Sequence, residues 1–155
     1  AVSVVDRRME EGEMDAEIFA LLLGLLRALE IISALPRQEC DEADRFSEKI
    51  FLLSQGFFWK LLERLGYRIE THRCAVGQEV LVANGRYCFS PDVGGIVCDY
   101  HRDRASIALP FGESAVKFLR ILFANSLASL PKLSLNRETA LSLRRALKSF
   151  LDWTG

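Results

Sequence analysis

Residues 79–98 read EVLVANGRYCFSPDVGGIVC, and this stretch decides the fold because helical periodicity stops here and short β-like runs begin. The runs at residues 80–82 and 86–89 are separated by Asn84-Gly85. Asn-Gly between two such runs is typical of a type I′ hairpin turn, because both central residues of that turn need a positive φ. The sequence therefore predicts a hairpin centred on Asn84.

A second turn follows at Ser90-Pro91-Asp92, and Gly94-Gly95 then opens another short strand at residues 96–98. Proline, aspartate and glycine are turn formers because of their backbone preferences and local hydrogen bonding. Together these signals predict a small β module over residues 72–102.

Helical periodicity dominates on both sides of this module. Apolar residues recur at steps of three and four over residues 15–35 and 43–65, and again over 113–127 and 136–152. The first of these segments is apolar nearly all round, which predicts a central position. The expected fold is mostly α: a bundle of about four main helices, forming one domain over residues 1–155 with the β-hairpin or zinc-ribbon-like module inserted.

Local signals mark the ends of the expected helices. Asp15 is a candidate N-cap for the first helix, and Pro36 should end it. Gly66 suits a left-handed residue after the second helix. Either Ser134 or Asn136 should cap the last helix.

Composition indicates an ordinary folded domain. The 155 residues are 50% hydrophobic and 26% charged, with a net charge of -1. No run approaches the roughly 20 apolar residues that cross a bilayer, so no membrane contact is expected. The four cysteines, at positions 40, 74, 88 and 98, are too few for a disulfide scaffold in a chain of this length, and a reducing, cytoplasmic setting follows.

Cys98 and His101 form a C-x-x-H pair, a spacing that lets two side chains chelate one metal from a tight turn. Cys74 is the third candidate ligand, but Gly77 stands where a C-x-x-C pair would supply the fourth. His72 or Cys88 could substitute.

The alternative is a vestigial site whose cysteines pack as small apolar residues. We therefore expect partial or no zinc occupancy and no other cofactor. A Cys98 nucleophile with His101 as base lacks an orienting acid and an oxyanion loop in the sequence, so no enzyme activity is expected.

Charge is divided unevenly, with -5 over residues 1–70 and +4 over residues 71–155. A basic C-terminal half is compatible with a polyanionic partner, although a solvated helix face explains such charges equally well. The candidate contacts for DNA or for a partner's tail are Lys117, Arg120, Arg144, Arg145 and Lys148.

Several segments resemble the zinc-module region of the RecO family of bacterial recombination-mediator and DNA-repair proteins. The most specific are HRCAVG at residues 72–77 and YCFSPDVGGIVCDYH at 87–101, which contains an F-S-P-x-x-G-G-x-x-C element. LLERLGY at 61–67, EEGE at 10–13 and the closing helix at 141–153 fit the same family.

The resemblance implies a non-enzymatic factor in DNA repair and homologous recombination that assists strand annealing and RecA loading on single-stranded DNA. It implies RecR, the C-terminal tail of the single-strand-binding protein and, indirectly, RecA as partners, in the bacterial cytoplasm at the nucleoid. RecO proteins begin with a DNA-binding OB-fold that has no counterpart in this sequence, and relatives with four cysteines have one where Gly77 stands. The alternative function is a zinc-ribbon-containing protein-interaction domain without direct DNA contact.

Overall fold

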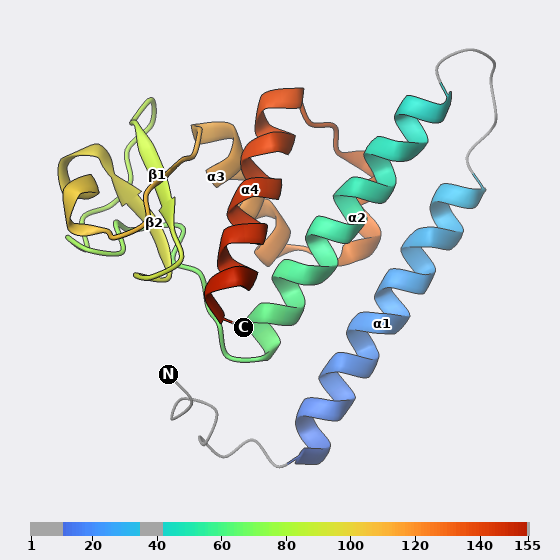
Figure 1. Ribbon diagram of the computed structural model, residues 1–155. Helices are drawn as coiled ribbons and strands as arrows, with labels where there is room; N and C mark the ends of the chain where they lie inside the picture. Colours follow the sequence, from blue (N-terminus) through green and yellow to red (C-terminus); the bar gives the residue numbers. More distant parts are fainter. Residues whose placement is uncertain (1–10, 35–41, 155) are drawn as a thin grey trace. The chain divides into compact units, whose positions relative to one another are not determined.

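The computed structural model describes residues 11–34 and 42–154, and the chain divides into two compact units (Figure 1). The first unit comprises the described residues up to Tyr67 together with residues 125–134. The second comprises residues 68–124 and the described residues from Leu135 onward.

The first unit is helical. It contains α1 (Glu11–Ser33), α2 (Glu42–Arg64) and the short 3-10 helix η3 (Leu127–Lys132), each of which contacts the other two. Buried side chains from all three helices form the core, among them Ala28, Ile32, Leu52, Leu53, Trp59, Leu127 and Leu130.

The helix ends were predicted with mixed success. Gly66 ends α2 with a φ of 90°, as expected. Tyr67 N donates to Leu62 O at 2.9 Å, so this carbonyl of the last helical turn has a hydrogen-bond partner. The expectation for Asp15 was wrong, because α1 begins at Glu11 and Asp15 lies inside it. Pro36 lies outside the described residues.

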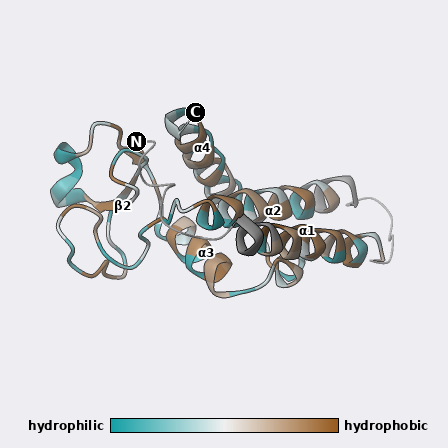
Figure 2. Cartoon of the chain, turned by 90° about the horizontal axis from the view of Figure 1, so that it is seen from below, coloured by the Kyte–Doolittle hydropathy of each residue, from teal (hydrophilic) through white to brown (hydrophobic). Residues whose placement is uncertain are grey.

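The expected central position of the first helix was also wrong. Phe19 and Leu26 of α1 are 62% and 61% exposed. Hydrophobic residues are spread along the whole helix in Figure 2. An all-round apolar helix predicts burial on every side, but the contacts of α1 within its own unit cover only part of its surface.

The second unit is built around a three-stranded antiparallel sheet of order β2-β1-β3. The strands are β1 (Tyr87–Ser90), β2 (Gly95–Cys98) and β3 (Leu109–Pro110), with Tyr87 opposite Cys98 and Ser90 opposite Gly95. The 3-10 helix η2 (Asp99–Arg104) follows β2, and the helices α3 (Glu113–Ala124) and α4 (Arg137–Thr154) complete the unit.

Aromatic contacts join the sheet to α4. Phe89 of β1 is fully buried, with its ring centroid 5.8 Å from that of Phe111 and 6.1 Å from that of Phe150. Such aromatic pairs add packing energy to the burial of apolar area. The sheet is therefore packed against helices of the same unit rather than held only by its own hydrogen bonds.

The hairpin forms one turn later than the Asn-Gly pair predicted. The antiparallel pair is β1–β2, closed by residues 91–94 with Gly94 at a φ of 73°. Residues 80–82 do not pair with β1; Val80 instead forms an isolated bridge with Arg73. Asn84 has a φ of 60°, but it is the second residue of a turn that begins at Ala83. A type I′ turn needs two successive positive φ values, and this turn has one.

The last two helices end close to their predicted positions, and Asn136 caps α4 by accepting a 2.8 Å hydrogen bond from Thr139 N. On these helices Ile121, Leu141 and Leu151 are exposed, whereas Leu143 and Leu147 are buried. No helix in the described ranges has the length and hydropathy needed to cross a membrane.

Candidate metal centre and basic surface

The loop over residues 74–79 folds back on Cys74. Cys74 N donates to Glu79 O at 2.8 Å, and Gln78 N donates to Cys74 O at 2.9 Å. Gln78 adopts a φ of 64°, which reverses the chain before Glu79. This tight return brings the side chain of Glu79 beside the thiol of Cys74.

The C-x-x-H pair occupies the junction of β2 and η2. Cys98 is the last residue of β2, and the 3-10 helix begins directly after it. Side chains three residues apart lie over one another in a 3-10 helix, so His101 returns to Cys98. His101 Nδ1 lies 3.3 Å from Cys98 Sγ and 3.7 Å from Cys74 Sγ.

Glu79 completes a four-residue cluster. Its Oε1 lies 2.9 Å from His101 Nδ1 and accepts a 3.3 Å hydrogen bond from Cys98 Sγ. One ligand atom from each of Cys74, Glu79, Cys98 and His101 lies within 4.8 Å of the others. Two thiols, an imidazole and a carboxylate so arranged could hold a metal ion.

Backbone N–H groups prepare the buried thiol for this role. Gly77 N and Cys98 N each lie 3.5 Å from Cys74 Sγ. Burial opposes ionisation of Cys74, but the N–H groups of Gly77, Cys98 and Val76 outweigh it and lower the pKa of the thiol from 9.0 to about 7. The thiolate is the form that binds metal, so these N–H groups favour a ligand.

The second thiol of the cluster behaves differently. Burial above all, together with the neighbouring Cys74 and Glu79, raises the pKa of Cys98 from 9.0 to about 11, against a hydrogen bond from the backbone of His101. Two adjacent thiols resist ionising together, so Cys74 ionises first.

The structure places the three predicted ligands together and adds a fourth that the sequence analysis missed. His72 and Cys88, which the sequence left open as substitutes, lie outside this cluster. His72 is exposed and Cys88 is buried in β1, where burial raises the pKa of its thiol; neither belongs to the cluster. Glu79 lies only two residues after Gly77, so the nearness of a carboxylate to the expected fourth position was the available signal.

Glu79 and His101 fill the space that a side chain at position 77 would need. A Cβ atom at Gly77 would lie 2.1 Å from Glu79 Oε2 and 2.2 Å from His101 Cε1. Real Cβ atoms do not approach other atoms so closely, so a side chain at 77 would have to displace the side-chain ends of Glu79 and His101. The carboxylate thus occupies the volume of the ligand that the C-x-x-C pattern lacks.

A thiol, an imidazole and a carboxylate meet here, but not in the order of a catalytic triad. In a triad the nucleophile and the acid bond to opposite nitrogens of the histidine. Cys98 Sγ and Glu79 Oε1 both approach Nδ1 of His101. The arrangement therefore suits convergence on one ion better than proton relay.

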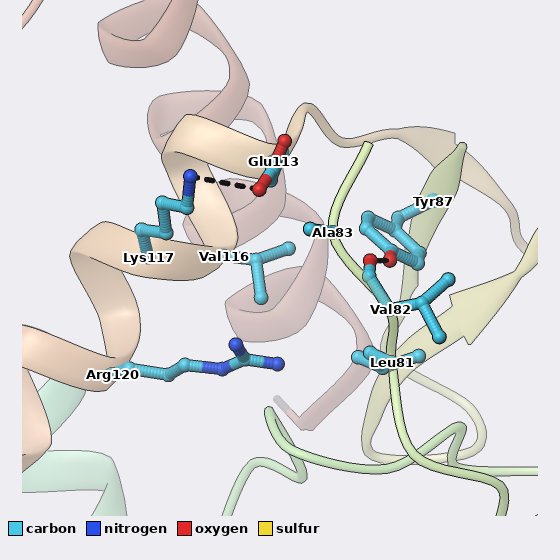
Figure 3. A pocket seen from close by; sticks show the side chains of 8 residues that line it. All are labelled: Leu81, Val82, Ala83, Tyr87, Glu113, Val116, Lys117 and Arg120. Carbon is cyan, nitrogen blue, oxygen red and sulfur yellow. Dashed lines mark hydrogen bonds and ion pairs between the residues drawn. The ribbon is translucent and has the colours of Figure 1, made fainter. Parts of the chain in front are cut away.

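A small pocket lies elsewhere in the second unit, between α3 and the segment before β1 (Figure 3). Its volume is about 160 Å³. It is lined by Leu81, Val82, Ala83, Tyr87, Glu113, Val116, Lys117 and Arg120.

Polar contacts fix the rim of this pocket. Lys117 Nζ lies 2.7 Å from Glu113 Oε1, and the hydrogen bond to Lys117 lowers the pKa of Glu113. Arg120 Nε donates to Thr71 O at 2.8 Å. Tyr87 Oη donates to Val82 O on the other wall. The pocket therefore combines an apolar floor with two cationic groups at its edge.

The five predicted contact residues divide into two sets. Lys117 and Arg120 line the pocket, but none of its lining residues comes from α4. Arg144, Arg145 and Lys148 are exposed on α4, and Lys148 Nζ lies 3.7 Å from Asp152 Oδ2. The candidates therefore fall on a pocket rim and on a helix face.

A small antiparallel sheet, set among helices and carrying a cluster of two cysteines, a glutamate and a histidine, defines the class: a mostly helical protein with a zinc-module-like insertion. The family model described as "Recombination protein O C terminal" matches residues 1–154. The chain therefore belongs to the RecO family.

Curated relatives agree with this assignment. The DNA repair protein RecO of Roseiflexus sp. (strain RS-1) is 32% identical over 97% of this chain and 48% of its own length. The DNA repair protein RecO of Dehalococcoides mccartyi (strain ATCC BAA-2266 / KCTC 15142 / 195) is 35% identical over 63% of this chain and 38% of its own length. The chain thus spans about half the length, or less, of these two relatives. No solved structure matches it.

Proposed function

We propose that this chain is the C-terminal part of a non-enzymatic recombination mediator that assists strand annealing and RecA loading on single-stranded DNA. The observation that carries the proposal is the family match over residues 1–154. The names of the relatives, DNA repair protein RecO, support it. The convergence of Cys98 and Glu79 on one nitrogen of His101 supports a structural rather than a catalytic role for the cluster.

In this proposal Cys74, Glu79, Cys98 and His101 hold a structural Zn²⁺ ion. Zinc favours thiolate, imidazole and carboxylate ligands, and four protein ligands close a structural site. The bound ion supplies a cross-link between the 74–79 loop, β2 and η2. Such a link substitutes for core that a small three-stranded sheet cannot provide.

The pocket at α3 is the proposed binding site for the acidic C-terminal tail of the single-strand-binding protein. Leu81 and Val116 offer an apolar floor, and Lys117 and Arg120 offer positive charge at the rim. An apolar pocket with a basic edge suits an acidic peptide that carries apolar residues. Because Lys117 is already paired with Glu113, Arg120 is the stronger candidate for a carboxylate.

The exposed α4 residues Arg144, Arg145 and Lys148 are the proposed contacts for the DNA backbone. Positive side chains on an exposed helix face attract phosphates. This attraction weakens as the salt concentration rises, because the release of counterions from the DNA then contributes less to binding. RecR and, indirectly, RecA complete the proposed set of partners, and the proposed location is the bacterial cytoplasm at the nucleoid.

Salt dependence tests the proposal. Binding of a fluorescein-labelled oligothymidylate and of a labelled tail peptide is measured by anisotropy between about 50 and about 300 mM salt, where phosphate contacts lose strength steeply. Exchanging Arg144 and Arg145 for glutamine should weaken DNA binding. It should also reduce the salt slope, the steepness with which the logarithm of the binding constant falls with the logarithm of the salt concentration, by up to about two. Exchanging Arg120 for glutamine should weaken binding of the tail peptide and leave DNA binding unchanged. Lys132→Gln serves as a control in the first unit.

The outcomes separate the functions. If neither ligand binds at low salt, the proposal fails. If the peptide binds without salt dependence and DNA does not bind, the chain is a protein-interaction domain without direct DNA contact.

A further inference from the structure

Tyr100 in η2 has no role in the core or in the metal cluster. Its side chain is 88% exposed, more than any other large hydrophobic residue in the described ranges. η2 itself is hydrophilic, and it appears as a teal helix beside β2 in Figure 2. One exposed aromatic residue is ordinary on a protein surface, but Tyr100 differs in how its ring is held and in the charges that its helix carries.

The tyrosine ring is oriented by the metal cluster beside it. The ring centroids of Tyr100 and His101 are 4.9 Å apart, with an interplanar angle of 88°. His101 is in turn held by Cys98 and Glu79 through its Nδ1 atom. An aromatic ring that is oriented before a ligand arrives loses less conformational entropy on binding.

Three arginines lie in η2 or beside its start. Arg102 and Arg104 belong to η2, and Arg86 lies at its start because Asp99 N donates to Arg86 O at 3.1 Å. All three side chains are exposed, and among the described residues none has a salt bridge. They offer charge to a ligand without giving up an internal partner.

The same helix also carries two acids, Asp99 and Asp103. Their charges offset those of Arg102 and Arg104, so η2 alone is not a strongly basic patch. A purely electrostatic ligand, such as an acidic peptide, would gain little here and would be repelled by both aspartates. A ligand that also stacks on an open aromatic face would gain from Tyr100 whatever the net charge.

We propose that η2 is a stacking platform for single-stranded DNA, on which one base stacks against Tyr100 while neighbouring phosphates contact Arg102, Arg104 and Arg86. Proteins that bind single strands commonly combine an exposed aromatic ring with nearby arginines, because every base has a π face. The inference rests on the proposed DNA-binding function and assigns a contact to the β module, in addition to α4.

The first test replaces the ring in the full 155-residue chain. Binding of fluorescein-labelled oligothymidylate is measured by anisotropy for Tyr100→Ala, for Tyr100→Phe and for Phe19→Ala, an exposed aromatic of the first unit. Loss of one stacked base should weaken binding by about five- to a hundredfold in Tyr100→Ala. Tyr100→Phe should stay within about twofold of the wild type because phenylalanine also stacks, and Phe19→Ala should bind as the wild type does.

The second test observes stacking directly. In Tyr100→Trp, oligothymidylate should quench tryptophan fluorescence beyond the change seen with the wild type, which contains Trp59 and Trp153. Two charge variants should change DNA binding in opposite directions. Arg102→Gln should lower the salt slope by up to about one, whereas Asp103→Asn should strengthen binding.

The outcomes distinguish this inference from the proposed function. If the chain binds oligothymidylate but Tyr100→Ala binds equally well and Tyr100→Trp shows no quenching, the platform is wrong and the DNA-binding function stands. If the chain does not bind oligothymidylate at low salt, the proposed DNA contact itself fails. Because Tyr100 touches His101, circular dichroism and cobalt absorption must match the wild type; where Tyr100→Ala fails that check, the Tyr100→Trp quenching decides.

Discussion

At the scale of single residues, the cluster brings together four candidate ligands from the 74–79 loop, β2 and η2. Gly77 leaves space at the position where a C-x-x-C pair would place a thiol, and the carboxylate of Glu79 fills that space. The N–H of Gly77 still points at Cys74 Sγ from 3.5 Å. This turn thus directs a backbone N–H at the Cys74 thiol, and Glu79, two residues further on, supplies the fourth candidate ligand.

Glu79→Gln should weaken metal binding by about tenfold or more, because a neutral amide is a poorer ligand than a carboxylate and removes one charge from the site. Cobalt titration, followed by absorption and by competition with a chelator, measures the affinity. Glu138→Gln, an exposed acid of α4, is the matched control. Equal affinities for Glu79→Gln and the wild type would exclude Glu79 as a ligand.

Gly77→Cys sharpens this prediction. Alone it should destabilise the loop, because its Cβ atom would meet Glu79 Oε2 and His101 Cε1. Combined with Glu79→Ala, it should recover metal binding through a third thiolate, and cobalt would then show stronger thiolate charge-transfer absorption. If the double variant binds metal no better than Glu79→Ala, a side chain at position 77 cannot replace the carboxylate of Glu79 as a ligand.

The hairpin turn depends on one carboxylate, that of Asp92. Asp92 Oδ2 accepts a 2.7 Å hydrogen bond from Ser106 N, and Oδ1 accepts one from the Ser90 hydroxyl. Burial opposes ionisation, but these bonds prevail and hold the pKa of Asp92 below 3.8. A carboxylate with a depressed folded-state pKa stabilises the fold above the unfolded value of 3.8, and that contribution is lost as pH falls through the folded pKa.

Asp92→Ala should therefore lower the free energy of unfolding at pH 7 by about 1–2 kcal/mol, the size of such partly exposed hydrogen bonds. The difference in the free energy of unfolding between the variant and the wild type should narrow as pH falls below 3.8. Urea unfolding at pH 7 and pH 3 measures both values. A gap that stays constant across this range would show that the charge of Asp92 is unimportant.

At the scale of elements, caps and turns decide where each helix and strand ends. The sequence left Ser134 and Asn136 open as caps for α4, and the structure selects Asn136 through its bond to Thr139 N. The α2 end at Gly66 and the turn at Gly94 use positive φ values, which glycine adopts at little cost. These local signals operate over three or four residues and are therefore readable in sequence.

Asn136→Ala should cost about 1 kcal/mol of stability, the usual effect of removing an N-cap side chain. Ser134→Ala should change stability by less than about 0.5 kcal/mol, because it removes no cap. Urea denaturation of both variants at pH 7 gives the comparison. A larger loss in Ser134→Ala than in Asn136→Ala would reverse the assignment.

At the scale of the whole molecule, the chain divides into a helical unit and a unit that combines sheet, helices and cluster. All four cluster residues belong to the second unit, as do the pocket and the exposed face of α4. The features proposed for metal, DNA and partner binding are thus concentrated there. The first unit contributes a hydrophobic core and a partly exposed α1.

Metal binding should stabilise the second unit of the chain, because an ion that binds the folded form and not the unfolded one adds RT ln(1 + [L]/Kd) to its stability. Adding zinc at about a hundred times its Kd should contribute roughly 2.7 kcal/mol. The unfolding temperature of the zinc-loaded chain should fall when a chelator is added. In Cys98→Ser the chelator should lower the unfolding temperature by less. An equal fall in this variant and in the wild type would show that the ion binds at another site.

The sequence by itself determined the helices, the small sheet, the cap at Gly66, three members of the cluster and, through its resemblance, the family. These features follow from periodicity, from turn chemistry or from short motifs, all of which act between residues close in the chain. Only the tertiary structure decided which turn closes the hairpin, that Glu79 rather than His72 or Cys88 joins the cluster, and that the basic residues split between a pocket and α4. The physical reason is that strand pairing, metal-site geometry and pocket formation join residues far apart in the chain, whose distances no local pattern contains.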